Sequence, residues 1–109
     1  MTEAQRERRR HARFPLGLPV GLRVGGRKTP LMVELLDVSE SGARFSASDA
    51  EVRIRVDERA AFGFVVPDRP SCQAQGLVVR ADRSGQFVLA LDDKNESFVG
   101  FIRLLEAES

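Results

Sequence analysis

The sequence predicts an all-β domain, a closed β-barrel of six or seven short strands followed by one C-terminal helix. Apolar and polar residues alternate through most of the chain, and glycine or proline separates the alternating runs, which is the pattern of short strands joined by turns. The pattern changes to helical spacing only near the C-terminus. The chain has 109 residues, which fits a single domain.

The first fifteen residues are predicted to form a flexible, arginine-rich arm, and the barrel with its helix is predicted to occupy residues 16–109. Five of the first thirteen residues are arginine, opposed by two glutamates, and they show no apolar periodicity. Pro15 disfavours helical conformation at Phe14 and would therefore end any helix in the arm. Strict alternation begins at Leu18, so the first strand is predicted over residues 18–24.

The next strands are predicted on both sides of a polar loop. Residues 31–38 are almost continuously apolar and are expected to form a central strand that is buried on both faces. After the loop Asp37–Gly42, alternation resumes over residues 43–47. Residues 52–56 alternate as well, which predicts a short strand with one solvent-exposed face.

Three further strands are predicted in the C-terminal half. Small and phenylalanine side chains form an inward row over residues 60–66, which ends at a proline. Residues 72–81 and 87–91 predict a hairpin around the turn at residues 83–85.

The last element is predicted to be a helix that covers one opening of the barrel. Its apolar stripe recurs at helical spacing and consists of Phe98, Phe101, Ile102 and Leu105. Asn95 directly precedes this stripe and is a suitable residue to cap the helix.

Composition and charge restrict the classes of function. With 42% hydrophobic and 30% charged residues, the chain is expected to be globular rather than disordered. No apolar run is long enough to span a bilayer and the N-terminus is polar, so neither membrane insertion nor a secretory signal is expected. The single cysteine, Cys72, can form neither an internal disulfide nor a zinc cluster, which fits a reducing cytoplasm. The net charge of +1 argues against a domain that coats nucleic acid.

Two segments contain the residues best suited to bind a nucleotide. The arginines of the arm offer planar guanidinium groups, which can grip phosphate oxygens or the O6 and N7 acceptors of guanine. In the loop, Asp37 can accept from the ring N–H and the amine of guanine, Ser39 can bond a base edge or a phosphate, and Gly42 allows close backbone approach. The same loop residues also fit a simple turn, in which Asp37 or Ser39 bonds local backbone and Gly42 has a positive φ. Arg44 follows on the outer face, where contact with ligand and simple solvation are both open.

The order of these segments resembles the signature of PilZ domains, receptors for the bacterial second messenger cyclic di-GMP. An RxxxR motif at Arg9 and Arg13 precedes a D/NxSxxG motif, and the resemblance extends over the arm, the barrel and the terminal helix. It implies a six-stranded antiparallel barrel, with arm arginines that bind the phosphates and Hoogsteen edges of the ligand. The ligand-binding residues that it implies are Arg8, Arg9, Arg10, Arg13, Asp37, Ser39 and Gly42.

We therefore expect a cytoplasmic receptor for cyclic di-GMP that uses no cofactor or metal and is not an enzyme. The sequence has no Walker loop, HExxH motif or nucleophile elbow, and its one histidine lies in the arm. The arm is expected to close on the ligand, and the signal is expected to pass in trans to an effector protein. One alternative is a PilZ-fold interaction adaptor without nucleotide binding, which the intact motifs disfavour. The other is a nucleic-acid-binding barrel, which the lack of tryptophan and tyrosine disfavours.

Overall fold

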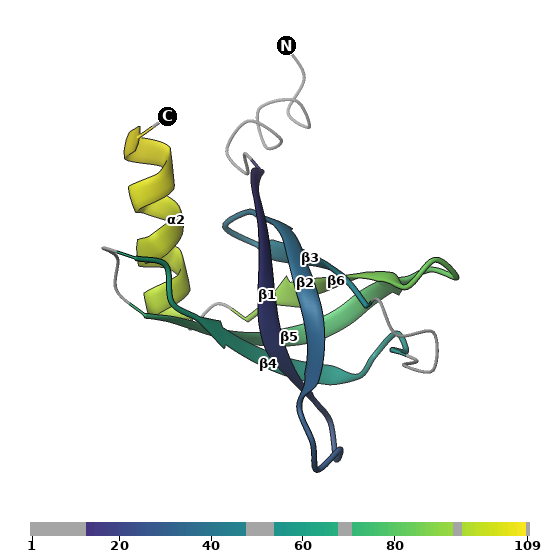
Figure 1. Ribbon diagram of the computed structural model, residues 1–109. Coiled ribbons are helices and arrows are strands. Elements are labelled where there is room, and N and C mark those ends of the chain that lie inside the picture. Colours follow the sequence, from purple (N-terminus) through teal and green to yellow (C-terminus); the bar gives the residue numbers. More distant parts are fainter. Residues whose placement is uncertain (1–12, 48–53, 68–70, 93–94, 109) are drawn as a thin grey trace.

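The computed structural model describes residues 13–47, 54–67, 71–92 and 95–108, and over these it shows a closed antiparallel β-barrel followed by a helix (Figure 1). The six strands are β1 (Phe14–Val24), β2 (Leu31–Val38), β3 (Gly42–Ser46), β4 (Arg59–Phe64), β5 (Cys72–Ala81) and β6 (Gln86–Leu91). Around the barrel their order is β1-β2-β3-β6-β5-β4, and β4 pairs with β1 to close it. The helix is α2 (Glu96–Glu108). The predicted fold class is confirmed.

Phenylalanine side chains fill the middle of the barrel. The ring of Phe45 stacks on Phe87 at 5.2 Å and meets Phe62 edge-on at 5.0 Å. These three residues come from β3, β6 and β4, so the cluster joins strands that are far apart in the sequence. Burial of such apolar rings is the main contribution that holds a small closed barrel together.

Helix α2 packs against the end of the barrel formed by β4 and β5 (Figure 1). Phe98 lies edge-on to Phe62 at 6.1 Å, and Phe101 lies edge-on to Phe64 at 5.1 Å. The predicted apolar stripe is confirmed, since its first three residues are buried and Leu105 is partly buried against the core.

Asn95 lies directly before α2, as predicted, but its side chain forms hydrogen bonds to strand β5 instead of capping the helix. The carbonyl of Asn95 accepts the N–H of Val99 at 2.9 Å, which begins the helix. Its side-chain amide instead bonds both the N–H and the C=O of Gln75, at 3.1 and 3.0 Å. Strand β6 ends at Leu91, opposite Gly76, so this part of β5 has no strand on that side. The asparagine side chain provides the acceptor for the Gln75 N–H, and at the Gln75 carbonyl it adds a second donor to the N–H of Asp92, which lies 3.0 Å away.

The prediction of a short strand over residues 52–56 is wrong for the residues of this segment that the structure describes. Val56 and Asp57 form a turn, and Asp57 has a φ of 75°. Aspartate tolerates this left-handed conformation, which does not occur in a regular stretch of strand. The turn is fixed to β5 because the Asp57 N–H donates to the Val78 carbonyl at 2.8 Å. Residues 52 and 53 lie outside the described residues.

Strand β2 is not buried on both faces, contrary to the expectation. Val33 and Leu35 point into the core, whereas Met32 is 66% exposed and Glu34 is also exposed. A closed barrel has only one dry face, so each of its strands alternates between core and solvent.

Strand β1 begins four residues before the alternation that predicted it. Its register against β2 shifts between Pro15 and Leu18, and Gly17 within this bulge has a φ of 65°. Burial alternates over the whole strand despite this shift, and Phe14 and Leu16 continue the row of Leu18, so the prediction began the strand too late. The arm was expected over residues 1–15, but residues 14 and 15 belong to β1, and residues 1–12 lie outside the described residues.

Candidate functional site

The part of the predicted site that the structure describes is centred on the carboxylate of Asp37, near the end of β2. Simple alternation from Leu35 would point Asp37 into the core. The register shows instead that Leu35 lies opposite Phe45 whereas Asp37 lies opposite Arg44, so Leu36 is an extra residue in a β-bulge. Because Arg44 points outward and is exposed, the bulge places Asp37 on the outer face beside it.

Two arginines bind this carboxylate from opposite sides. Arg13 Nη1 lies 2.8 Å from Asp37 Oδ1, and Arg44 Nη2 lies 2.6 Å from Asp37 Oδ2. The aspartate side chain is only 9% exposed, whereas those of Arg13 and Arg44 are 55% and 46% exposed. The guanidinium groups thus cover the carboxylate and still offer N–H donors to solvent or to an anion.

The loop after Asp37 is a tight turn held by its own residues. The Ser39 N–H donates to the Gly42 carbonyl at 2.8 Å, and the Ser39 hydroxyl lies 3.4 Å from the same oxygen. Ser39 is 3% exposed, so its hydroxyl stabilises the turn. The alternative expectation of a positive φ at Gly42 is wrong. Glycine fits there because a Cβ would lie 3.1 Å from the Leu89 carbonyl oxygen, closer than ordinary contact.

A row of side chains continues from Asp37 across the outer face of three further strands. Arg44 of β3 lies opposite Val88 of β6, and Val88 lies opposite Arg80 of β5. A second register shift, between Val78 and Arg80, moves Arg80 to the outer face, where it is exposed. The row therefore presents a carboxylate, an arginine, a half-buried apolar side chain and a second arginine.

The structure brings together some of the residues that the sequence predicted for the site. Arg13 and Asp37 are in direct contact, and Ser39 and Gly42 form the adjoining turn. The other predicted ligand-binding residues, Arg8, Arg9 and Arg10, lie outside the described residues. Sequence reasoning left Arg44 undecided and did not assign Arg80 to the site. Simple alternation from Val78 would point Arg80 inward, and only the register shift shows that it points outward.

The thiol of Cys72 lies apart from this site, at the start of β5. The residue is 1% exposed, and burial raises the pKa of the thiol to about 11. The thiol is therefore protonated near neutral pH and is a poor nucleophile. Cys72 serves as a small apolar side chain in the core.

Comparison with known proteins identifies the family. A model of the PilZ domain matches residues 7–103, which is most of the chain and includes both motif segments. No curated protein matches the chain. Over the residues that the structure describes, no helix has the length and apolar character needed to cross a membrane. PilZ domains are in general receptors for cyclic di-GMP, and they typically bind ligand rather than catalyse a reaction. This chain belongs to the PilZ domain family.

Proposed function

We propose that this protein is a receptor for cyclic di-GMP that passes the signal in trans to an effector protein in the bacterial cytoplasm. The observation that supports this most strongly is the carboxylate of Asp37, which is held on the outer face between two half-exposed arginines. Guanine presents a ring N–H and an amine to such a carboxylate, and the ligand's phosphates accept hydrogen bonds from arginine. The guanine and the phosphates of the ligand thus both find complementary groups within one cluster of ion pairs.

Binding requires an exchange of partners at Asp37. Its side chain is only 9% exposed, so a guanine edge reaches it only if a guanidinium group moves away. Arg44 lies within β3, which is paired on both sides, and it keeps its place on Oδ2. Arg13 precedes β1. When the ligand binds, Arg13 breaks its contact with Asp37 Oδ1 and donates to a ligand phosphate instead. The closing movement expected of the arm is thereby modified, because at Arg13 the ligand replaces a contact that already exists.

The rest of the row completes the proposed binding surface. Arg44 and Arg80 flank Val88, so a planar base can lie on the valine while phosphates lie against the two arginines. Arginines 8 to 10 add further phosphate contacts from the arm. Ser39 and Gly42 hold the turn that keeps the end of β2 in position.

Isothermal titration calorimetry of the whole chain tests this function. Cyclic di-GMP should bind, whereas GTP and an RNA oligomer, as controls for a nucleotide or nucleic-acid site of another kind, should bind far more weakly. A chain that releases no heat with cyclic di-GMP, while circular dichroism shows it folded, would be an adaptor without nucleotide binding. Equal binding of the RNA oligomer would indicate a nucleic-acid-binding barrel.

A further inference from the structure

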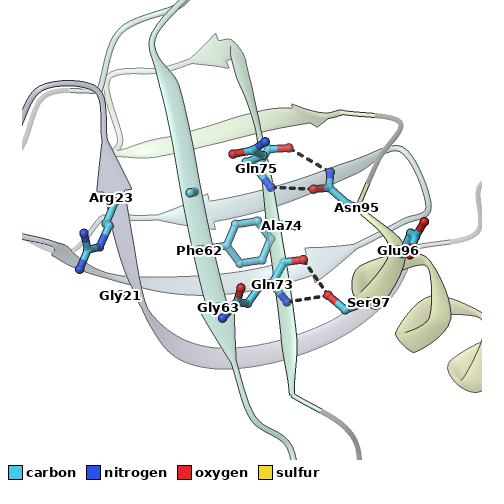
Figure 2. A pocket seen from close by; sticks show the side chains of 11 residues that line it. Gly21, Arg23, Phe62, Gly63, Gln73, Ala74, Gln75, Asn95, Glu96 and Ser97 are labelled. Atoms are coloured by element: carbon cyan, nitrogen blue, oxygen red, sulfur yellow. Dashed lines mark hydrogen bonds between the residues drawn. The ribbon is translucent and has the colours of Figure 1, made fainter.

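A groove of about 470 Å³ crosses the outer face of β1, β4 and β5 and ends at the first turn of α2 (Figure 2). Arg23 of β1 lies at one side, and Ser97 and Glu96 of α2 lie at the other. Between them lie Gly21, Ala61 and Gly63, with Gln73 and Gln75 of β5 nearer to α2. None of the residues in the row from Asp37 to Arg80 lines this groove.

Gly21 is a glycine that the fold does not require. It lies within β1 in regular register, opposite Met32 on one side and Gly63 on the other, and its φ is not positive. A Cβ at this position would meet only Pro30, at an ordinary contact distance of 3.9 Å. A glycine inside a strand weakens the strand, and it often marks a place where a ligand or another chain approaches closely. The open groove above Gly21 therefore explains why a glycine occupies this position.

Gly63 extends the same floor but also has a structural reason. A Cβ there would lie 3.3 Å from the Cys72 carbonyl oxygen and 3.3 Å from a side-chain carbon of Gln73. Together the two cross-strand glycines, Gly21 half-buried and Gly63 exposed, leave a strip of backbone without side chains.

The surroundings of this strip define the chemistry of an occupant. The two most exposed large hydrophobic residues of the described chain adjoin the strip: Met32, 66% exposed and opposite Gly21, and Val65, 71% exposed and two residues beyond Gly63. Arg23 is exposed and forms no ion pair with any residue that the structure describes. Glu96 provides a negative charge at the opposite side.

We propose that this groove docks an extended segment of a partner protein, which places an apolar side chain over Gly21 and Gly63 and a carboxylate against Arg23. The charges orient the segment, with its acidic end toward β1 and any basic residue toward Glu96. The exposed side-chain amides of Gln73 and Gln75 offer a donor and an acceptor to the peptide groups of the segment. The inference rests on the proposed function only in taking a partner protein as the receiver of the signal.

A random displayed peptide library, selected against the whole chain, tests this proposal. The enriched peptides should pair a large apolar residue with an acidic one. Their affinity, measured by fluorescence polarisation, should fall about tenfold or more in Gly21→Leu, which fills the floor, and in Arg23→Glu, which reverses its charge. A peptide with lysine in place of its acidic residue should regain binding to Arg23→Glu. Gly100→Leu and Arg103→Glu make the same changes on α2 outside the groove, and they should bind as the wild type does.

The proposal is overturned if no peptide with this chemistry is enriched, or if the enriched peptides bind Gly21→Leu and Arg23→Glu as well as the wild type. Gly21→Leu should keep or raise the melting temperature, because a Cβ at this position meets no close contact. Should it fail to fold, the charge exchange at Arg23 decides alone. Cyclic di-GMP titrations of the same variants should match that of the wild type. A wild type that binds no nucleotide would overturn the proposed function. The docking of a partner segment in the groove is tested separately, by the peptide affinities.

Discussion

Replacing Arg13 with glutamine should have opposite effects on two ligands that share a guanine. In the structure Arg13 donates to Asp37 Oδ1 at 2.8 Å, and its side chain is 55% exposed. An ion pair so exposed is worth about 0.5–1 kcal/mol at most. The charge-assisted bond that Arg13 makes to a ligand phosphate is worth about 1.5–3 kcal/mol. Exchanging the first contact for the second leaves a net contribution of about 1–2 kcal/mol to binding. Arg13→Gln should therefore bind cyclic di-GMP about five- to thirtyfold more weakly.

Guanosine has no phosphate, so it gains nothing from Arg13 and has to displace it from the carboxylate. The same substitution should therefore tighten guanosine binding, by up to about fivefold if the full ion pair of about 1 kcal/mol is released. Calorimetry measures the first affinity, and NMR titration measures the weaker second one. Arg103→Gln, the same change on α2, is the control. If Arg13→Gln weakens both ligands alike, or leaves guanosine binding unchanged, Arg13 does not cover the guanine-binding edge of Asp37.

Three further predictions follow from contacts outside the site. Asn95→Leu should lower the free energy of unfolding by about 1–3 kcal/mol, measured by chemical denaturation, because it leaves the Gln75 N–H without its side-chain acceptor, whereas the Gln75 C=O keeps the N–H of Asp92. The side-chain hydrogen bond from Ser84, followed by backbone N–H donors, lowers the pKa of Asp82, so its carboxylate stabilises the fold above its ordinary pKa and ceases to do so as the pH falls through the lower folded value. NMR titration should show this shift, and Ser84→Ala should reverse part of it, since the backbone donors remain; an unshifted Asp82 would contradict the turn geometry. Cys72 should react with a thiol reagent at neutral pH no faster than the protein unfolds, because its pKa is about 11 and the residue is buried; rapid labelling of the folded protein would contradict its place in the core.

The alternation of apolar residues predicted much of the barrel correctly. It located the β5–β6 hairpin and the apolar stripe of α2 almost at their observed bounds. The strands keep a two-residue period and the helix keeps a helical period, because one face of each packs on the core. The two motifs predicted that Arg13 and Asp37 both contact one ligand, whereas the direct ion pair between them was not predicted.

The bulges could not be predicted in the same way. Neither Leu36 nor Val79 has a glycine or proline beside it, so the sequence gives no local signal of an extra residue. A bulge of this kind shows only in the register against neighbouring strands, which depends on the closed barrel as a whole. The outward position of Arg80 was missed for this reason. The bonds from Asn95 to β5 were missed because they depend on where β6 ends.

The measurement that tests the central claim most directly is the selectivity of Asp37 between two cyclic dinucleotides. A carboxylate paired with a guanine edge discriminates against adenine, which lacks that pair of donors, by about 1–3 kcal/mol. Calorimetry should therefore show that the wild type prefers cyclic di-GMP to cyclic di-AMP by about five- to 150-fold. Asp37→Asn should lose most of this preference, whereas Asp57→Asn, the same change in an exposed turn, should keep it. A wild type that binds both dinucleotides equally, or an Asp37→Asn variant with undiminished selectivity, would contradict the account.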